Sequence, residues 1–281
     1  MSPDSLRNPF HPPDQRTGTP FELTRHLLPS AEAQALTEAL GEDEPSKLEP
    51  QQDLPPADIS MSGEERKEVE KEPLWIKEDY IKWAESFGRD EAWVDETFKF
   101  QPDGTTVVNT DLILEAKEIK QLPIGLMEVK GNLDISKNSS FKLNGYPKRV
   151  GGYFDCSYND LSSPQGMPEE VGGDISFEYS NLNFLVGLPK KVNGELNLIG
   201  NQLVNLKGIS KKIDGSLFVS DNPLGSLNDL VGTKIDNSLS LQLIPATEIP
   251  AGIEIGGDIY IHKYQTDLIA DAKRKGYHVG N

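Results

Sequence analysis

One short pattern of apolar and polar residues recurs along the last two thirds of this 281-residue chain. Each copy begins with Val or Ile, usually has Gly two residues later, and ends with two apolar residues that flank a polar one, as in VNGELNL. The copies start 21 residues apart five times, then 22 and then 20, at Val108, Val129, Val150, Val171, Val192, Ile213, Ile235 and Ile255. A fixed period of this length predicts a stacked repeat array.

The alternation inside each copy predicts one β-strand per unit. If the aliphatic start is position 1, positions 5 and 7 are apolar in all eight units. A period of two is typical of a strand, so positions 5 and 7 are expected to face inward and positions 4, 6 and 8 outward. Positions 12 and 15 are usually Leu or Ile, so the return path adds to the core. Stacking would join the strands into a parallel sheet.

Position 10 is Asn in four units and Ser in a fifth: Asn138, Asn159, Ser180, Asn201 and Asn222. A stacked amide can bond the backbone of adjoining turns, although Asn also suits a turn without such a ladder. The segments LNLIGNQL at 196–203 and LFVSDNPL at 217–224 resemble the core motif of leucine-rich repeats, L-x-L-x-x-N-x-L. The short unit is similar to the compact bacterial class, as in uncharacterised bacterial and phage repeat proteins.

The resemblance covers roughly residues 108–264 and implies a leucine-rich-repeat-like solenoid of eight units. The units begin Val-x-Gly-x-Leu where the family has Leu-x-x-Leu, which leaves a three-sided β-solenoid as the alternative. Twenty-one residues are too few for a full helix on the return side, so an extended or 3₁₀ return is expected in both cases.

Both ends of the array carry signals for caps, which a stacked repeat needs because its terminal units lack a neighbour. Residues 73–107 hold a hairpin signal and an apolar stripe at helical spacing that ends before Gly88: Ile76, Tyr80, Trp83 and Phe87. Residues 265–281 predict a helix with Thr266 as N-cap and Gly276 beyond its end. The predicted fold class is therefore mainly β, a parallel solenoid with one strand per repeat between an N-terminal helix and hairpin cap and a C-terminal capping helix.

Residues 1–72 differ in composition from the rest of the chain. Ten of the 20 prolines lie in the first 60 residues, and residues 1–106 hold 24 acids and 11 bases, a net −13 of the total −17. Such a segment buries too little apolar surface to offset its chain entropy. We expect a disordered, acidic, proline-rich arm with short helical segments after Thr19 and Ser30.

Charge is also segregated within the array. The outward positions 4, 6 and 8 hold eight carboxylates and no Lys or Arg, although residues 107–281 contain 17 bases. This pattern predicts an acidic, aromatic-dotted sheet face that binds a protein partner of basic character. The candidate partner-binding residues are Tyr153, Asp155, Asp174, Glu178, Glu195, Phe218 and Tyr260. The alternative interpretation is that Asp, Ser and Asn only keep an exposed sheet soluble.

Several functions are disfavoured by the composition. The net charge of −17 argues against nucleic acid and anionic membrane as partners. No apolar run is long enough to cross a bilayer and the first residues lack a secretory signal, so a cytoplasmic monomer is expected. Cys156 occupies an inward position and the four histidines show no ligand spacing, so no catalytic group, metal or cofactor is predicted.

The leading hypothesis is a non-enzymatic scaffold for protein–protein interaction. Paired acids such as Asp155 and Asp174 keep a second hypothesis open, a carbohydrate-binding or carbohydrate-active β-solenoid, because glycoside hydrolysis uses two carboxyl groups. The third hypothesis is a structural spacer without a ligand.

Overall fold

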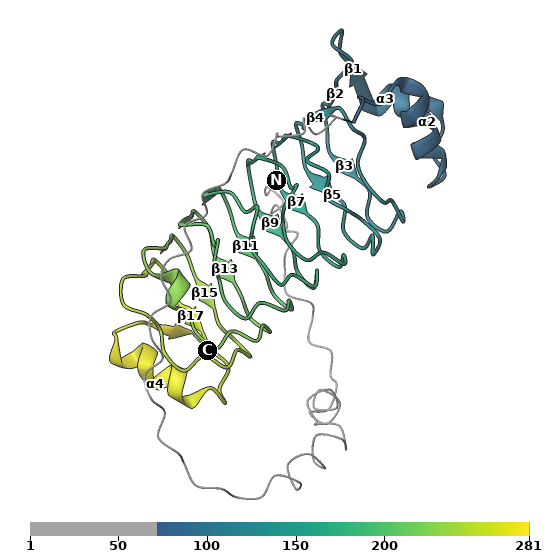
Figure 1. Ribbon diagram of the computed structural model, residues 1–281. Coiled ribbons are helices and arrows are strands. Elements are labelled where there is room, and N and C mark those ends of the chain that lie inside the picture. Colours follow the sequence, from purple (N-terminus) through teal and green to yellow (C-terminus); the bar gives the residue numbers. More distant parts are fainter. Residues whose placement is uncertain (1–71, 281) are drawn as a thin grey trace, which may run out of the picture. The chain divides into compact units, whose positions relative to one another are not determined.

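The repeats stack as coils of a parallel β-solenoid (Figure 1). The computed structural model describes residues 72–280, so the predictions for the arm, its disorder and its short helices, lie outside the described residues. Within 72–280, eight coils of about 21 residues follow one another in sequence order, with helices at both ends of the stack. The predicted mainly β solenoid is confirmed.

One long sheet contains the strand that the repeat pattern predicts. Eight of its nine strands occupy positions 5 and 6 of a coil, and the ninth follows the C-terminal helix. Successive strands pair in parallel without a register shift, for example Leu196 with Leu217. This nine-stranded sheet, called the long sheet below, consists of β3 (Leu112–Ile113), β5 (Leu133–Asp134), β7 (Phe154–Asp155), β9 (Ile175–Ser176), β11 (Leu196–Asn197), β13 (Leu217–Phe218), β15 (Leu239–Ser240), β17 (Ile259–Tyr260) and β18 (Val279–Gly280).

Each coil also has a second short strand, where only one strand per unit was predicted. This strand ends at the aliphatic position 1, whose side chain is buried in seven coils and half-buried at Ile255. Two sheets result, called the flank sheets: β1 (Phe98–Phe100), β2 (Thr106–Val108), β4 (Leu126–Val129), β6 (Arg149–Val150) and β8 (Glu170–Val171) in the first, and β10 (Lys191–Val192), β12 (Lys212–Ile213), β14 (Lys234–Ile235) and β16 (Glu254–Ile255) in the second. Most of these strands have two residues, too few to show a period of two in the sequence.

The solenoid interior is filled by the apolar positions of the repeat. All side chains at positions 5 and 7 are buried, which confirms the predicted register of the long sheet. Phe154 and Phe177 meet inside it edge to face, with ring centroids 5.7 Å apart. Fully burying one such side chain contributes about 1.5–3 kcal/mol, so each coil depends on its neighbours for its stability.

Glycine at position 3 marks the corner between the two strands, where the backbones of adjacent coils come very close. A Cβ on Gly215 would lie 2.6 Å from the carbonyl carbon of Gly194, and one on Gly152 would lie 2.0 Å from Oδ1 of Asn132. Both distances are shorter than ordinary van der Waals contacts, so a side chain there would separate the coils. This close approach explains why the spacer of the repeat is usually glycine.

The Asn ladder predicted at position 10 is present. Oδ1 of Asn201 accepts bonds from the amides of Ser180 (3.2 Å) and Leu182 (2.9 Å), and its Nδ2 donates to the carbonyls of Phe177 and Leu198, both at 2.9 Å. The same pattern holds at Asn138, Asn159 and Asn222. These buried amides satisfy backbone groups of two coils where the chain leaves the long sheet.

The N-terminal cap contains two helices, α2 (Lys77–Glu85) and α3 (Glu91–Thr97), before the predicted hairpin of β1 and β2. Tyr80 is fully buried, and its hydroxyl lies 2.6 Å from Oγ1 of Thr106. Ile76 departs from the predicted stripe, because it precedes α2 and is 62% exposed. The second helix was not predicted from the sequence, although Asp90 caps it by accepting a bond from the amide of Trp93.

At the other end the predicted capping helix is present as α4 (Thr266–Arg274), which buries Leu268 and Ala272. The residue at the cap position is Gln265, and Thr266 is the first helical residue. The Gln265 side chain has another role: Nε2 donates to the carbonyls of Leu241 and Ile244, and Oε1 accepts from the amide of Leu243. It therefore continues the Asn ladder into the last coil with a longer side chain.

The ladder gives a test of what holds the coils together. We expect Asn201→Ala to lower the free energy of unfolding by about 3–5 kcal/mol, because it leaves several buried backbone groups without partners. Asn183→Ala, an exposed Asn 18 residues earlier, should change it by less than about 0.5 kcal/mol. Urea unfolding of both variants measures the difference. Equal effects would mean that the buried amide only fills a turn.

Candidate functional site

All seven predicted site residues lie on the outward face of the long sheet, but the structure does not bring all of them together. The residues at position 6 of neighbouring strands pair with one another in register. From β7 to β17 they are Asp155, Ser176, Asn197, Phe218, Ser240 and Tyr260. Strands are spaced about 4.8 Å apart. Phe218 is therefore about 14 Å and Tyr260 about 24 Å from Asp155, too far for one shared contact with a small group.

The outward positions are more covered than an exposed sheet face would be. Ser176 is fully buried, and its hydroxyl lies 2.7 Å from that of Ser157. Ser220 and Ser240 form a second hydroxyl pair at 2.7 Å, and Asn197 is also buried. Neighbouring polar side chains on this face therefore shield one another from solvent.

Asp174 and its equivalents have a structural role at the corner of the coil. Oδ1 of Asp174 accepts a bond from the amide of Glu195 at 2.7 Å. Asp111 accepts in the same way from the amide of Asn132, and Asn132 from that of Tyr153. The position 4 side chain thus replaces a backbone carbonyl between coils, so Asp174 belongs to the coil contacts.

Three other carboxylates form the core of the candidate site: Asp134, Asp155 and Glu178, called the acidic cluster below. Asp134 and Asp155 are register partners in β5 and β7. Each accepts a bond at 2.9 Å from an amide two residues later, Ser136 and Ser157 respectively. Oε2 of Glu178 accepts from Nδ2 of Asn197 at 3.2 Å. These bonds orient the carboxyl groups on one half-buried patch.

The environment of Asp155 and Glu178 disfavours the negative charge of both side chains. Burial raises the pKa of Asp155 to about 6, and the nearby charges of Asp134 and Glu178 act in the same direction, while the bonds from Ser157 oppose the rise. Burial also raises the pKa of Glu178. Desolvation penalises a carboxylate unless a cation or enough hydrogen bonds compensate it.

No Lys or Arg in residues 72–280 forms an ion pair with Asp134, Asp155 or Glu178. The ammonium of Lys137, in the same part of the array, pairs with Glu115 at 2.6 Å and is also attracted by the charge of Asp134. Within residues 72–280, Asp155 and Glu178 are therefore partly desolvated carboxylates without an ion pair, whereas Asp134 has Lys137 nearby.

Two tyrosines beside the acidic cluster were not among the predicted site residues. Tyr158 and Tyr179 occupy position 9 of adjacent coils, are 45% and 44% exposed, and stack with ring centroids 5.5 Å apart. The hydroxyl of Tyr158 donates to Oε1 of Glu178 at 3.4 Å. Both residues have positive φ, +56° and +48°. An aromatic residue at the same position of two consecutive units was the signal in the sequence.

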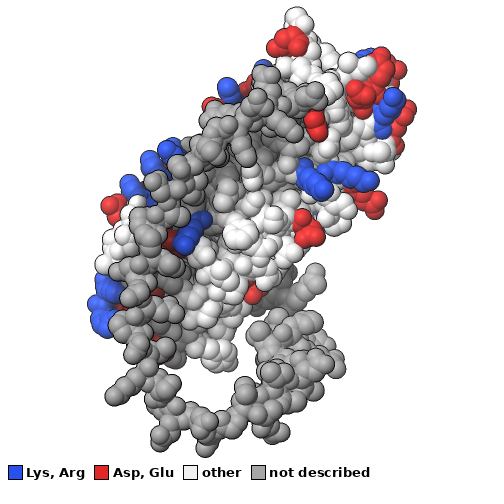
Figure 2. Space-filling model, in the orientation of Figure 1, with Lys and Arg blue, Asp and Glu red and all other residues white. Residues whose placement is uncertain are grey.

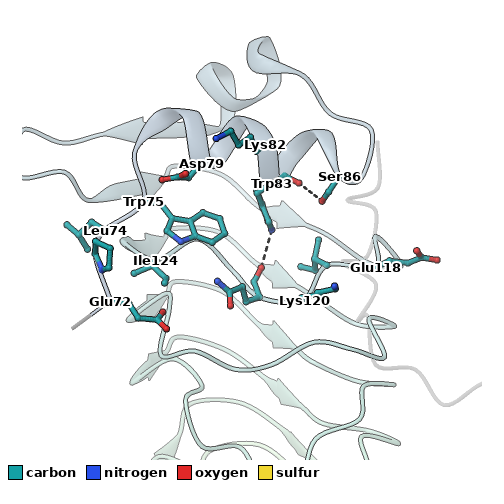
Figure 3. Close-up of a pocket in the computed structure, with 13 residues that line it drawn as sticks. Glu72, Leu74, Trp75, Asp79, Lys82, Trp83, Ser86, Glu118, Lys120 and Ile124 are labelled. Atoms are coloured by element: carbon teal, nitrogen blue, oxygen red, sulfur yellow. Dashed lines mark hydrogen bonds between the residues drawn. The ribbon is translucent and has the colours of Figure 1, made fainter. Parts of the chain in front are cut away.

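A cleft of about 870 Å³ lies at the N-terminal end, between α2 and the first coil (Figure 3). Trp75, Trp83 and Ile124 form its apolar walls, and Lys82 and Lys120 lie at its rim. Nε1 of Trp83 donates to the carbonyl of Gln121 at 3.1 Å, and the amide of Trp75 donates to the carbonyl of Ile124 at 2.9 Å. These bonds fasten the cap to the first coil, which is the role that we assign to the cleft.

Other chemistry in the described residues is limited. Cys156 is fully buried at position 7, as expected of a core residue, and burial raises the pKa of its thiol well above the ordinary value. Within 72–280, no three or more His, Cys, Asp or Glu side chains are grouped so that they could hold a metal ion. No helix in this part of the chain is long and apolar enough to cross a membrane.

Comparison with protein-family models, with curated proteins and with solved structures finds no match for this chain. The chain is thus a parallel solenoid with coils of about 21 residues that is assigned to no repeat family. A function has to be inferred from the geometry of the long sheet and its acidic cluster.

The raised pKa of Asp155 predicts how stability depends on pH. In the folded chain the group titrates near 6, above the value of about 3.9 in an unfolded chain. The folded state therefore binds more protons between these values, and the contribution of Asp155 to stability is full below pH 4 and is lost as the pH rises through 6.

We expect Asp155→Asn to raise the free energy of unfolding by on the order of 2–3 kcal/mol at pH 7.5 and to leave it unchanged at pH 4. The Asn side chain can still accept the bond from Ser157. Chemical unfolding of both proteins at the two pH values tests this. An equal increase in the free energy of unfolding at both pH values would contradict the account in which the ionised Asp155 carboxylate is desolvated.

Proposed function

We propose that this chain is a non-enzymatic binding scaffold whose acidic cluster contacts a basic group of a protein partner. The observation that carries the proposal is the pair of partly desolvated carboxylates, Asp155 and Glu178, which lie beside Asp134 and form no ion pair within residues 72–280. Such a group costs stability in the free protein. A feature that costs stability is more readily understood if it serves recognition.

A lysine or arginine side chain of the partner would supply the missing positive charge. Its attraction to the cluster is stronger than at a fully solvated site, because the carboxylates are half-buried and screened less by water. The gain in affinity depends on good hydrogen-bond geometry, since the partner's cation is desolvated as well. A bidentate guanidinium meets this need better than an ammonium.

The aromatic residues around the cluster fit the same kind of partner. Tyr153 lies within the field of Asp111, Glu115, Asp134 and Asp155, and Tyr158 hydrogen-bonds Glu178. Tyrosine rings give large contact area at low entropic cost and attract cations above their faces. Phe218 and Tyr260, which lie farther along the sheet, would contact the partner only if it extended over several coils.

Other parts of the initial interpretation stay predictions. The leucine-rich-repeat type, the monomeric state and the cytoplasmic location have support only from the sequence pattern and composition. Asp174, one member of the acid pair considered for carbohydrate chemistry, bonds the backbone of the next coil. We therefore place the carbohydrate-binding or carbohydrate-active solenoid and the spacer after the protein-binding scaffold.

Selection of random peptides displayed on phage against the full-length chain tests the proposal. We expect enrichment of Arg and Lys, and loss of binding by the selected peptides when Asp134→Asn, Asp155→Asn and Glu178→Gln are combined. These substitutions keep the size of each side chain. The matched control combines Glu248→Gln, Glu254→Gln and Asp267→Asn, which removes the same charge from exposed positions elsewhere.

Enriched peptides without Arg or Lys, or peptides that bind both triple variants equally, would contradict the proposal. A glycan array probed with the same three proteins distinguishes the second hypothesis. Glycan binding that the acidic-cluster variant loses would favour a carbohydrate-binding solenoid.

The proposed contact also predicts a pH dependence of binding. A cation binds the ionised form of Asp155, so protonation near pH 6 competes with the partner. The affinity of a selected peptide should fall about tenfold between pH 7 and pH 5, as expected for one proton taken up on release. Calorimetric titration at both values measures it. The Asp155→Asn variant should bind weakly at both pH values with little change between them.

A further inference from the structure

The flank sheets carry a row of lysines that the acidic cluster does not explain. Just before position 1, the residues of β4, β6 and β8 alternate in charge and pair in register as Glu128, Arg149 and Glu170, with an ion pair of 3.2 Å between Arg149 and Glu170. In β10, β12 and β14 the same place holds three exposed bases, called the lysine row below: Lys191, Lys212 and Lys234.

Like charges at directly paired positions of adjacent strands destabilise a sheet. Asp214 partly relieves this by contacting Lys191 at 2.8 Å and Lys212 at 3.2 Å, and Asp236 lies 3.2 Å from Lys234. Two more lysines, Lys190 and Lys211, precede the row. Five positive and two negative charges leave a local net charge of +3 on a chain of net charge −17.

The two additional lysines differ in their contacts. The ammonium of Lys211 donates to the carbonyls of Asp229 (2.8 Å) and Val231 (3.0 Å), which ties it to the return side of the following coil. Lys190 is exposed and forms no ion pair with any residue in 72–280. The positive charge of the row is thus only partly used inside the described part of the chain. Figure 2 shows Lys and Arg spaced along one flank of the array.

The length of the row limits what can bind to it. Glu170 occupies the preceding coil and Glu254 follows Lys234 in register, so acids bound the row at both ends. Three strands at about 4.8 Å span only about 10 Å. A long polyanion such as nucleic acid would extend past the row onto these acids and into the field of a negative protein. A short acidic stretch would not.

A groove adjoins the first lysine of the row. The two flank sheets are not hydrogen-bonded to each other between β8 and β10, and Nδ2 of Asn193 bonds the carbonyl of Val171 there at 2.7 Å. A cleft of about 400 Å³ opens at this break, lined by Arg149, Pro189, Lys191 and Asn193 among others. Glu169 and Glu170 also line it and are paired with Lys148 and Arg149, so the cleft can hold an uncharged part of a peptide beside the lysine row.

We infer that the lysine row binds a short acidic segment of a partner protein in extended conformation. In an extended chain, alternate side chains on one face are about 6.6–6.8 Å apart, a spacing that flexible lysine side chains on adjacent coils can meet. The lysine row lies on a flank sheet and is positively charged, whereas the acidic cluster lies on the long sheet and is negatively charged. One chain would therefore offer two contacts of opposite charge.

The test measures binding of hexaglutamate to the full-length chain at low ionic strength by calorimetry. Combining Lys191→Gln, Lys212→Gln and Lys234→Gln should weaken binding by at least about tenfold, and salt should weaken binding to the unmodified chain. The matched control combines Lys117→Gln, Lys120→Gln and Lys142→Gln, which removes the same charge from the first two coils and should stay within about twofold. All six side chains lie at the surface, and thermal melts of both triple variants confirm that they fold.

Several results would overturn the inference. Equal weakening by both triple variants would mean that binding depends on the net charge of the chain and not on the lysine row. Absence of hexaglutamate binding at low salt would show that the lysine row is not a binding site for acidic peptides. A heptathymidylate of equal charge that binds more tightly than hexaglutamate would point to nucleic acid. A change of sedimentation in the lysine-row variant alone would identify a second copy of this chain as the occupant. The acidic-cluster variant should bind hexaglutamate at least as well as the unmodified chain, which separates this test from the proposed function.

Discussion

Every coil of this protein depends on the next one for the partners of its backbone amides and carbonyls. Strands of two residues cannot form a stable sheet alone, because a single coil has neither a complete set of hydrogen bonds nor a closed core. Where the backbone leaves the strands, side chains complete the bonding: Asn201 and its equivalents at position 10, Asp174 and Asn132 at the corner, and Gln265 in the last coil. The 21-residue period follows from this repeated set of bonds.

The same constraint divides the polar residues of the long sheet into two groups. Asp174 and Ser176 are used by the coil itself, since one accepts a backbone bond from the next coil and the other is fully buried in a hydroxyl pair. The Asp155 carboxylate accepts a bond from Ser157 of its own coil, and its charge is desolvated next to Asp134 and Glu178. A charge count treats these acids alike, whereas their contacts show which of them a partner could use.

Much of the fold could be predicted because the same pattern of apolar and polar positions recurs in all eight units. The buried positions 5 and 7 and the Asn ladder follow from side-chain type at a fixed place in the unit, and the capping helix α4 follows from its own start and stop residues. The second strand was not predicted, because it depends on bonds between coils and has too few residues to show a period. The short helix α3 was not predicted either, because its seven residues are too few to show a helical repeat of apolar positions.

The candidate site was predicted less completely than the fold. The sequence shows which positions face outward, but the distance of Phe218 and Tyr260 from Asp155 depends on how far apart their coils lie in the stack. Tyr158 and Tyr179 were missed because position 9 lies beyond the alternating residues, in a turn with positive φ. The burial of Asp155 depends on side chains from several coils, which no single repeat reveals.

The titration of the Asp155 side chain tests most directly whether the long sheet holds a partly desolvated carboxylate without a counter-ion. Carbon-detected NMR of the carboxyl group, assigned with the Asp155→Asn variant, gives its apparent pKa in the folded chain. Burial beside Asp134 and Glu178 predicts a midpoint of about 6. A midpoint near the ordinary value of about 3.9 would contradict it, because the group would then be solvated or paired and would offer a partner no uncompensated charge.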